Sequence, residues 1–182
     1  MSAELRSLRD DPFELLLLLE TRLRATRLDI AAGQAESWTG LGFRIGRNWL
    51  AAPKEDVREV IVPPRPTRVP NAKPWLTGIA NVRGELLTIV DLRRLLGVEG
   101  DGEGRAQRVL VLNSERIPAG FLVDEVAGYR QFSPGEQRHE MKQGSGGYEP
   151  FLLGAFVRDG QPWLALSLHK VIQSGEFIMA GI

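Results

Sequence analysis

The sequence predicts a mainly β protein built from small closed barrels. From Leu41 onward, short runs of apolar and branched residues are separated by residues that favour turns, as in a series of short strands. The segment Arg158-Asp159-Gly160-Gln161 carries the Asp-Gly pair typical of a tight hairpin. Asn81-Val82-Arg83-Gly84 begins and ends with residues that tolerate positive φ. Closed barrels suit such strands because closure removes exposed sheet edges.

The strands follow from these runs in chain order. A first hairpin turns at Arg47-Asn48, and a proline-rich connector, Pro63 to Pro74, excludes helix after the third strand. The polar segment 131–147 is predicted to be a mobile loop. The predicted strands are 42–46, 49–52, 57–62, 86–90, 109–112, 117–126, 151–157 and 163–166.

Two short helices are predicted from their end signals. Asp91 follows a buried strand directly and can cap a helix over 92–96, which Gly97 can end in a left-handed conformation. Ser167 can cap a second helix that runs to about Ile172. Both helices are short enough to cover the end of a barrel.

A longer helix is predicted near the start of the chain, from Phe13 to about Ala31, with Asp11 as its cap. Leu16, Leu19 and Leu23 form an apolar stripe along it. The stripe fits either packing on the barrels or binding to a partner or a second copy. Both roles remain open from the sequence.

Composition restricts the class of function. Of 182 residues, 23 are Lys or Arg and 23 are Asp or Glu, so the net charge is zero and the basic surplus typical of nucleic-acid binding is lacking. The chain has no cysteine, which excludes disulfides and thiolate metal sites. The leucine run 15–19 is far shorter than the ~20 apolar residues that span a bilayer. We expect a soluble, cytoplasmic protein.

Catalytic motifs are missing, so we expect neither an enzyme nor a cofactor or metal site. His139 and His169 are the only histidines, and neither has the spacing of a metal ligand. The loop 100–104 is glycine-rich but acidic, and it lacks the Gly-Lys-Ser/Thr end of a phosphate-binding loop. Asp124 and Glu125 are neighbours on a predicted strand, so they face opposite sides and cannot act as a pair.

The segment from Gly78 to Leu92, GIANVRGELLTIVDL, resembles the signature of the CheW-like chemotaxis coupling proteins. Further blocks at 57–61, 122–126 and 151–172 resemble other strands of that family, so the likeness covers roughly 40–172. Within the family the chain looks most like the PilI type, which belongs to the chemosensory system of type IV pili and twitching motility. Trp75 and the segments 38–43 and 162–164 carry this narrower likeness.

The resemblance implies two SH3-like five-stranded β-barrels packed face to face, with short helices at their ends. It divides the chain into an N-terminal helical extension over 1–38, a CheW-like domain over 39–175 and a C-terminal tail over 176–182. The boundary between the two barrels is expected near the Gly/acid loop at 97–105.

The resemblance also implies a function and a site. The chain would be a non-enzymatic adaptor that binds the cytoplasmic tip of a methyl-accepting chemoreceptor and the regulatory domain of a CheA-like histidine kinase. It would be recruited from the cytoplasm to membrane-associated receptor arrays. Arg83 is expected to form an ion pair with Glu59, either as a staple within one barrel or as part of the receptor-binding groove. The expected partner-binding residues are Val57, Glu59, Asn81, Val82, Arg83 and Gly84.

Two alternatives remain open from the sequence. One is a coupling protein for flagellar chemotaxis instead of pili. The other, from a different class, is a small-barrel nucleic-acid-binding module in which aromatic residues such as Phe43, Trp49 and Trp75 would stack on bases. The zero net charge argues against this second alternative.

Overall fold

The computed structural model describes residues 37–98, 106–138 and 146–179. The chain divides into two units, Met1–Ser37 and Trp38–Ile182, and the fold presented here is that of the second. The helix predicted over 13–31, the loop at 100–104 and His139 lie outside the described residues.

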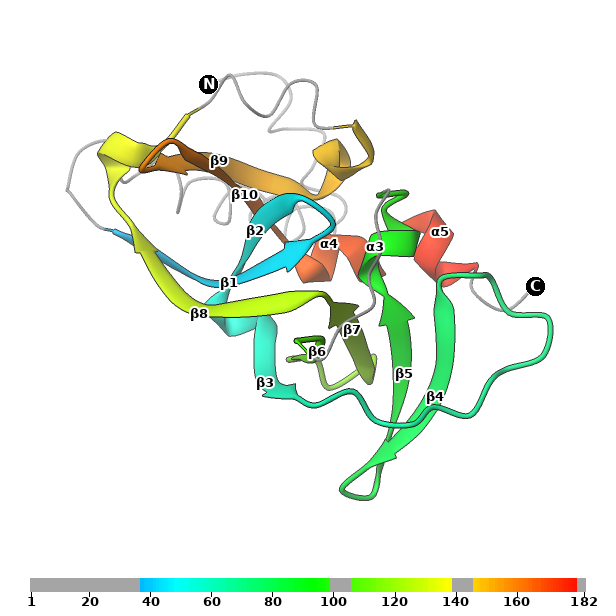
Figure 1. Cartoon of the computed structure of the whole chain (residues 1–182). Helices are drawn as coiled ribbons and strands as arrows, with labels where there is room; N and C mark the ends of the chain where they lie inside the picture. The colour runs from blue at the N-terminus through cyan, green and yellow to red at the C-terminus, as the bar shows by residue number, and fades with distance from the viewer. Residues whose placement is uncertain (1–36, 99–105, 139–145, 180–182) are drawn as a thin grey trace, which may run out of the picture. The chain divides into compact units, whose positions relative to one another are not determined.

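The second unit contains two five-stranded sheets, as predicted (Figure 1). The first sheet has, in spatial order, β8 (Glu125–Phe132), β1 (Trp38–Ile45), β2 (Asn48–Pro53), β10 (Gln161–Leu166) and β9 (Leu152–Arg158). The second sheet has β3 (Val57–Ile61), β6 (Arg108–Leu112), β7 (Ala119–Val123), β5 (Glu85–Asp91) and β4 (Leu76–Val82).

The sheets do not divide the chain into two halves near 97–105. The first sheet instead combines β1 and β2 with β8, β9 and β10, and the second sheet is made from the strands between them. A parallel pair joins the distant parts of the first sheet, because β10 lies along β2 with Trp163 opposite Trp49 and Ala165 opposite Ala51. The side chains of these two strands therefore alternate in step, which places Trp on Trp and Ala beside Ala.

Several strands carry buried apolar side chains on both faces, which explains near-continuous apolar runs such as 109–112. One cluster lies on the inner face of the first sheet and consists of Ala51, Phe132, Phe156, Trp163 and Ala165. A second lies on the inner face of the second sheet and consists of Ala80, Leu87, Ile89, Val109 and Val111. The third and largest cluster draws on both sheets and includes Phe43, Leu50, Leu110, Phe121 and Leu166.

The helices begin where the sequence predicts. Asp91 accepts a hydrogen bond from Arg94 N at 3.0 Å at the start of α3 (Leu92–Leu95), and Gly97 follows with φ +65°. Ser167 caps α4 (Leu168–Ile172) in the same way. Within the expected tail, a further helix, α5 (Gly175–Ile178), was not predicted. Ser174 caps it by accepting from Phe177 N, and the Phe177 ring stacks on Trp75 with centroids 5.9 Å apart.

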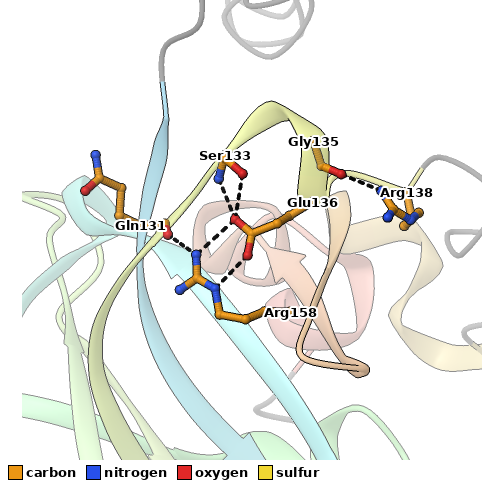
Figure 2. A network of polar contacts seen from close by, with 6 residues as sticks. All are labelled: Gln131, Ser133, Gly135, Glu136, Arg138 and Arg158. Carbon is orange, nitrogen blue, oxygen red and sulfur yellow. Dashed lines mark hydrogen bonds and ion pairs between the residues drawn. The ribbon is translucent and has the colours of Figure 1, made fainter.

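The predicted loop over 131–147 differs from the structure at its start. β8 continues to Phe132 and is followed by a 3₁₀ helix, Pro134–Glu136. Glu136 holds Arg158 of β9 through contacts of 2.6 Å to Nε and 2.9 Å to Nη2, while Arg158 also donates to the carbonyl of Gln131 (Figure 2). Since β8 and β9 are the two edges of the first sheet, this network joins edge to edge.

The same network predicts a pH dependence of stability. Hydrogen bonds from Arg158, and then from the backbone N–H of Ser133, lower the pKa of Glu136 to about 2. A lowered pKa in the folded state contributes stability that is complete above the unfolded value near 4.5 and is lost as pH falls toward 2.

We expect Glu136→Gln to lower Tm at pH 7 by no more than a few degrees, because surface pairs contribute about 1 kcal/mol or less.

Thermal unfolding at pH 7, 4.5 and 3 checks this expectation. The difference in Tm between wild type and Glu136→Gln should shrink on acidification. A difference that stays constant across this range would show that the Glu136 carboxylate does not carry the pH dependence.

Gly78 allows the proline-rich connector to cross β4. Thr67 exchanges two backbone hydrogen bonds with Ile79, at 2.8 and 2.9 Å. Gly78 has φ +145°, and a Cβ there would overlap the backbone carbonyl of Thr67.

We expect Gly78→Ala to lower the free energy of unfolding by about 2 kcal/mol or more, through strain and overlap together. Denaturant unfolding measures this, with Gly154→Ala as the control because a Cβ there meets open space.

Candidate partner-binding site

The hairpin of β4 and β5 ends in a two-residue turn made by Arg83 and Gly84. Val82 faces Glu85 across the hairpin, and both turn residues have positive φ, +53° for Arg83 and +89° for Gly84. Asn81, expected among the turn residues, lies in β4, and its Oδ1 accepts from Gly84 N at 2.9 Å. The left-handed conformation at an arginine is uncommon and costs about 1 kcal/mol.

Arg83 contacts Glu59 from this turn. Its Nη1 lies 2.8 Å from Glu59 Oε2, and the arginine side chain is 76% exposed whereas the glutamate is 25% exposed. β3 and β4 are the two edge strands of the second sheet, so the contact reaches from one edge to the end of the other. Figure 1 shows the hairpin of β4 and β5 projecting beyond the neighbouring strands. The high exposure of the Arg83 side chain leaves its guanidinium accessible to another molecule.

A second ion pair lies beside the first. Arg58 Nη2 lies 2.6 Å from Glu85 Oε2, and Arg58 Nη1 lies 3.4 Å from Oε1 of the same carboxylate. Both side chains are partly exposed, at 39% and 43%. The sequence analysis did not identify Arg58 or Glu85. The available signal was their charge order, since Arg58-Glu59 on one strand faces Arg83 and Glu85 on the hairpin.

The outer face of the hairpin adds exposed apolar surface to the charged turn. Leu86 is 61% exposed opposite Asn81, and Ile79 is 40% exposed opposite Thr88. On the inner face, Val82 packs against the cluster of the second sheet and is only partly accessible. The site therefore combines an accessible cation with exposed apolar residues on one projecting hairpin.

Val57 is not brought to this surface. It is 6% exposed and lies opposite Leu112 in the cluster shared by both sheets. A β-bulge between Val57 and Glu59 explains the difference, because it breaks the alternation that would place both side chains on one face. Its burial gives Val57 a packing role and does not support the expected partner contact.

Two titratable residues away from the hairpin, Asp56 and His169, lie close together at the start of α4. Buried Asp56 accepts from Leu168 N at 3.0 Å and from Ser167 Oγ at 3.3 Å, and burial raises the pKa of its carboxyl group. His169, expected to be solvated, is 26% exposed and lies 3.9 Å from Asp56. Within the described ranges, no three potential metal ligands come together.

The adjacent acids at the start of β8 also stabilise the fold. Asp124 accepts from Gly46 N at 2.6 Å, and Glu125 pairs with Arg44 at 3.1 Å. These contacts hold β8 beside β1.

Among residues 37–98, 106–138 and 146–179, no helix is both long and apolar enough to cross a bilayer.

Comparison with known proteins identifies the family. The model of the CheW-like domain matches residues 39–176. Protein PilI of Pseudomonas aeruginosa is 38% identical over 92% of this chain and 94% of its own length. Chemotaxis protein CheW of Thermotoga maritima is 27% identical over 73% of this chain and 86% of its own.

A solved structure shows the same fold. The scaffolding protein TtCheW of Thermoanaerobacter tengcongensis superposes with a TM-score of 0.67 at 19% identity, over 77% of this chain and 95% of that protein. The predicted fold of two five-stranded β units is thereby confirmed. Together the family model and the relatives show that the chain belongs to the CheW-like family of scaffold coupling proteins.

Proposed function

We propose that this chain is a non-enzymatic adaptor that couples a methyl-accepting chemoreceptor to a CheA-like histidine kinase. The observation that carries the proposal is the 38% identity to PilI over nearly the full length of both chains. The likeness extends over both sheets, as expected if the two proteins share a function as well as a core.

The receptor would bind at the hairpin of β4 and β5. A helical receptor tip presents apolar and polar residues along one face, and Leu86 and Ile79 offer apolar contacts of the matching kind. Arg83 uses one nitrogen on Glu59, and a guanidinium carries five N–H donors, so further donors can bind an oxygen of the receptor. Asn81 and Gly84 would set the position of this group through their hydrogen bond.

The kinase would bind a separate face through its regulatory domain. Signal transmission then needs no chemistry in this chain. A shift in receptor state would change the contacts made at the hairpin, and the differential affinity for the two states would bias the kinase.

The relative PilI also supports a specific pathway. We propose that the adaptor acts in the chemosensory system that controls type IV pili and twitching motility, in the cytoplasm beneath membrane-associated receptor arrays. The alternative output is flagellar chemotaxis. The 27% identity to the chemotaxis protein CheW of Thermotoga maritima supports this alternative.

Affinity capture from cytoplasm and membranes of the source organism tests the proposal. Wild type should recover a chemoreceptor and a CheA-like kinase. Arg83→Glu should lose the receptor, because the substitution removes the accessible cation and places a second carboxylate beside that of Glu59. Arg47→Glu is the matched control, since Arg47 is exposed in the turn between β1 and β2. Mass spectrometry of the kinase distinguishes pilus from flagellar systems.

Two outcomes of this capture would contradict the proposal. Recovery of neither a receptor nor a kinase by wild type would contradict the adaptor function. Recovery of nucleic acid in their place would favour the small-barrel nucleic-acid-binding module.

Substitution of Arg83 by glycine separates a binding role from a role in stability. Glycine relieves the left-handed strain of about 1 kcal/mol, while loss of the exposed ion pair costs about the same or less. We therefore expect Arg83→Gly to change Tm by less than about 3 °C and to weaken receptor binding at least about fivefold. Calorimetry and a binding titration measure the two effects. A large fall in Tm with unchanged affinity would make Arg83 a staple only.

A further inference from the structure

The two ion pairs at the hairpin carry their charges in a fixed order. β3 presents a cation followed by an anion, Arg58 and Glu59, while the hairpin presents Arg83 before Gly84 and Glu85 after it. Each charge therefore has an opposite charge one or two positions away in its own segment, besides the partner that it contacts between β3 and the hairpin. In the structure both pairs run between β3 and the hairpin of β4 and β5, and neither is formed within one segment.

The pairs differ in how tightly they are held. Arg58 makes two contacts with Glu85, at 2.6 and 3.4 Å, as a guanidinium fork does with a carboxylate. Arg83 makes one contact with Glu59 and is 76% exposed. The pKa of Arg58 is raised, chiefly by its hydrogen bond to Glu85 and to a smaller extent by the charge of Glu59. Arg58 therefore experiences the charge of Glu59, its neighbour on β3, as well as that of Glu85.

We propose that Arg58 and Glu85 are positioning residues, which keep Arg83 on Glu59 by occupying each other. While Arg58 is bound to Glu85, the Glu85 carboxylate is not available to form an ion pair with Arg83. While Glu85 holds Arg58, Arg58 cannot displace Arg83 from Glu59. The result is a single orientation of the Arg83 guanidinium toward a partner, and this inference rests on the proposed receptor-binding function.

The proposal gives a distinctive pattern for three variants. Arg58→Gln leaves Glu85 as a rival for Arg83, and Glu85→Gln leaves Arg58 as a rival for Glu59, so each should weaken binding about two- to fivefold. The double variant removes both rivals and should return to within about twofold of wild type. All three should keep a Tm near that of wild type, because exposed pairs add little stability.

The measurement is a titration of each protein with a purified cytoplasmic tip of the captured chemoreceptor, with Arg47→Gln as the control. A simple structural staple predicts that the double variant binds as weakly as the weaker single variant, or more weakly. That result, or single variants that bind like wild type, would overturn the proposal.

A second readout does not depend on the receptor. The Nε–H resonance of Arg83, assigned by its loss in Arg83→Lys, should move in each single variant and return toward its original position in the double variant. If wild type binds no receptor, the proposed function fails while this resonance still decides the positioning role. A resonance that stays fixed in both single variants would overturn that role.

Discussion

Contacts between arginine and glutamate join the two edge strands in each of the five-stranded sheets. In the first sheet, Glu136 and Arg158 connect the end of β8 to β9, and in the second, Glu59 and Arg83 connect β3 to the end of β4. These edge strands do not pair with each other in the described part of the chain. These charged contacts act together with short backbone bridges, Gln137 with Phe156 of β9 and Thr67 with Ile79 of β4, so part of an edge in each sheet is already occupied.

Burial on both faces of the sheets restricts where a partner can bind. In the described part of the chain, three apolar clusters bury many of the strand residues and leave them inaccessible to a partner. The hairpin of β4 and β5 is an exception, because Leu86 and Ile79 alternate outward while Leu87 and Ala80 face inward. Binding is therefore expected where one strand pair extends beyond the core.

Local features of the fold were predictable because they depend on adjacent residues. The caps at Asp91 and Ser167 and the turn at Asp159-Gly160 follow from side-chain chemistry within a few positions. The parallel pairing of β2 with β10 was not predictable in this way, since nothing local marks two strands so far apart in sequence.

In the candidate site, too, the features that depend on long-range strand pairing could not be predicted from the sequence. Its turn was recognisable from the sequence, but the β-bulge that buries Val57 depends on the pairing of β3 with β6. Arg58 and Glu85 form a pair only because the fold brings β3 close to the hairpin of β4 and β5, so this pairing could not be predicted from their positions in the sequence.

The chain order of the strands has a consequence for synthesis on the ribosome. The second sheet is continuous in sequence, from β3 through β7, so it can assemble as soon as residue 123 has emerged. The first sheet cannot, because β2 lacks its neighbour β10 until the chain is nearly finished. Apolar residues such as Phe43 and Leu50 therefore emerge before the second sheet but are buried late, so their surface is exposed on the nascent chain during synthesis.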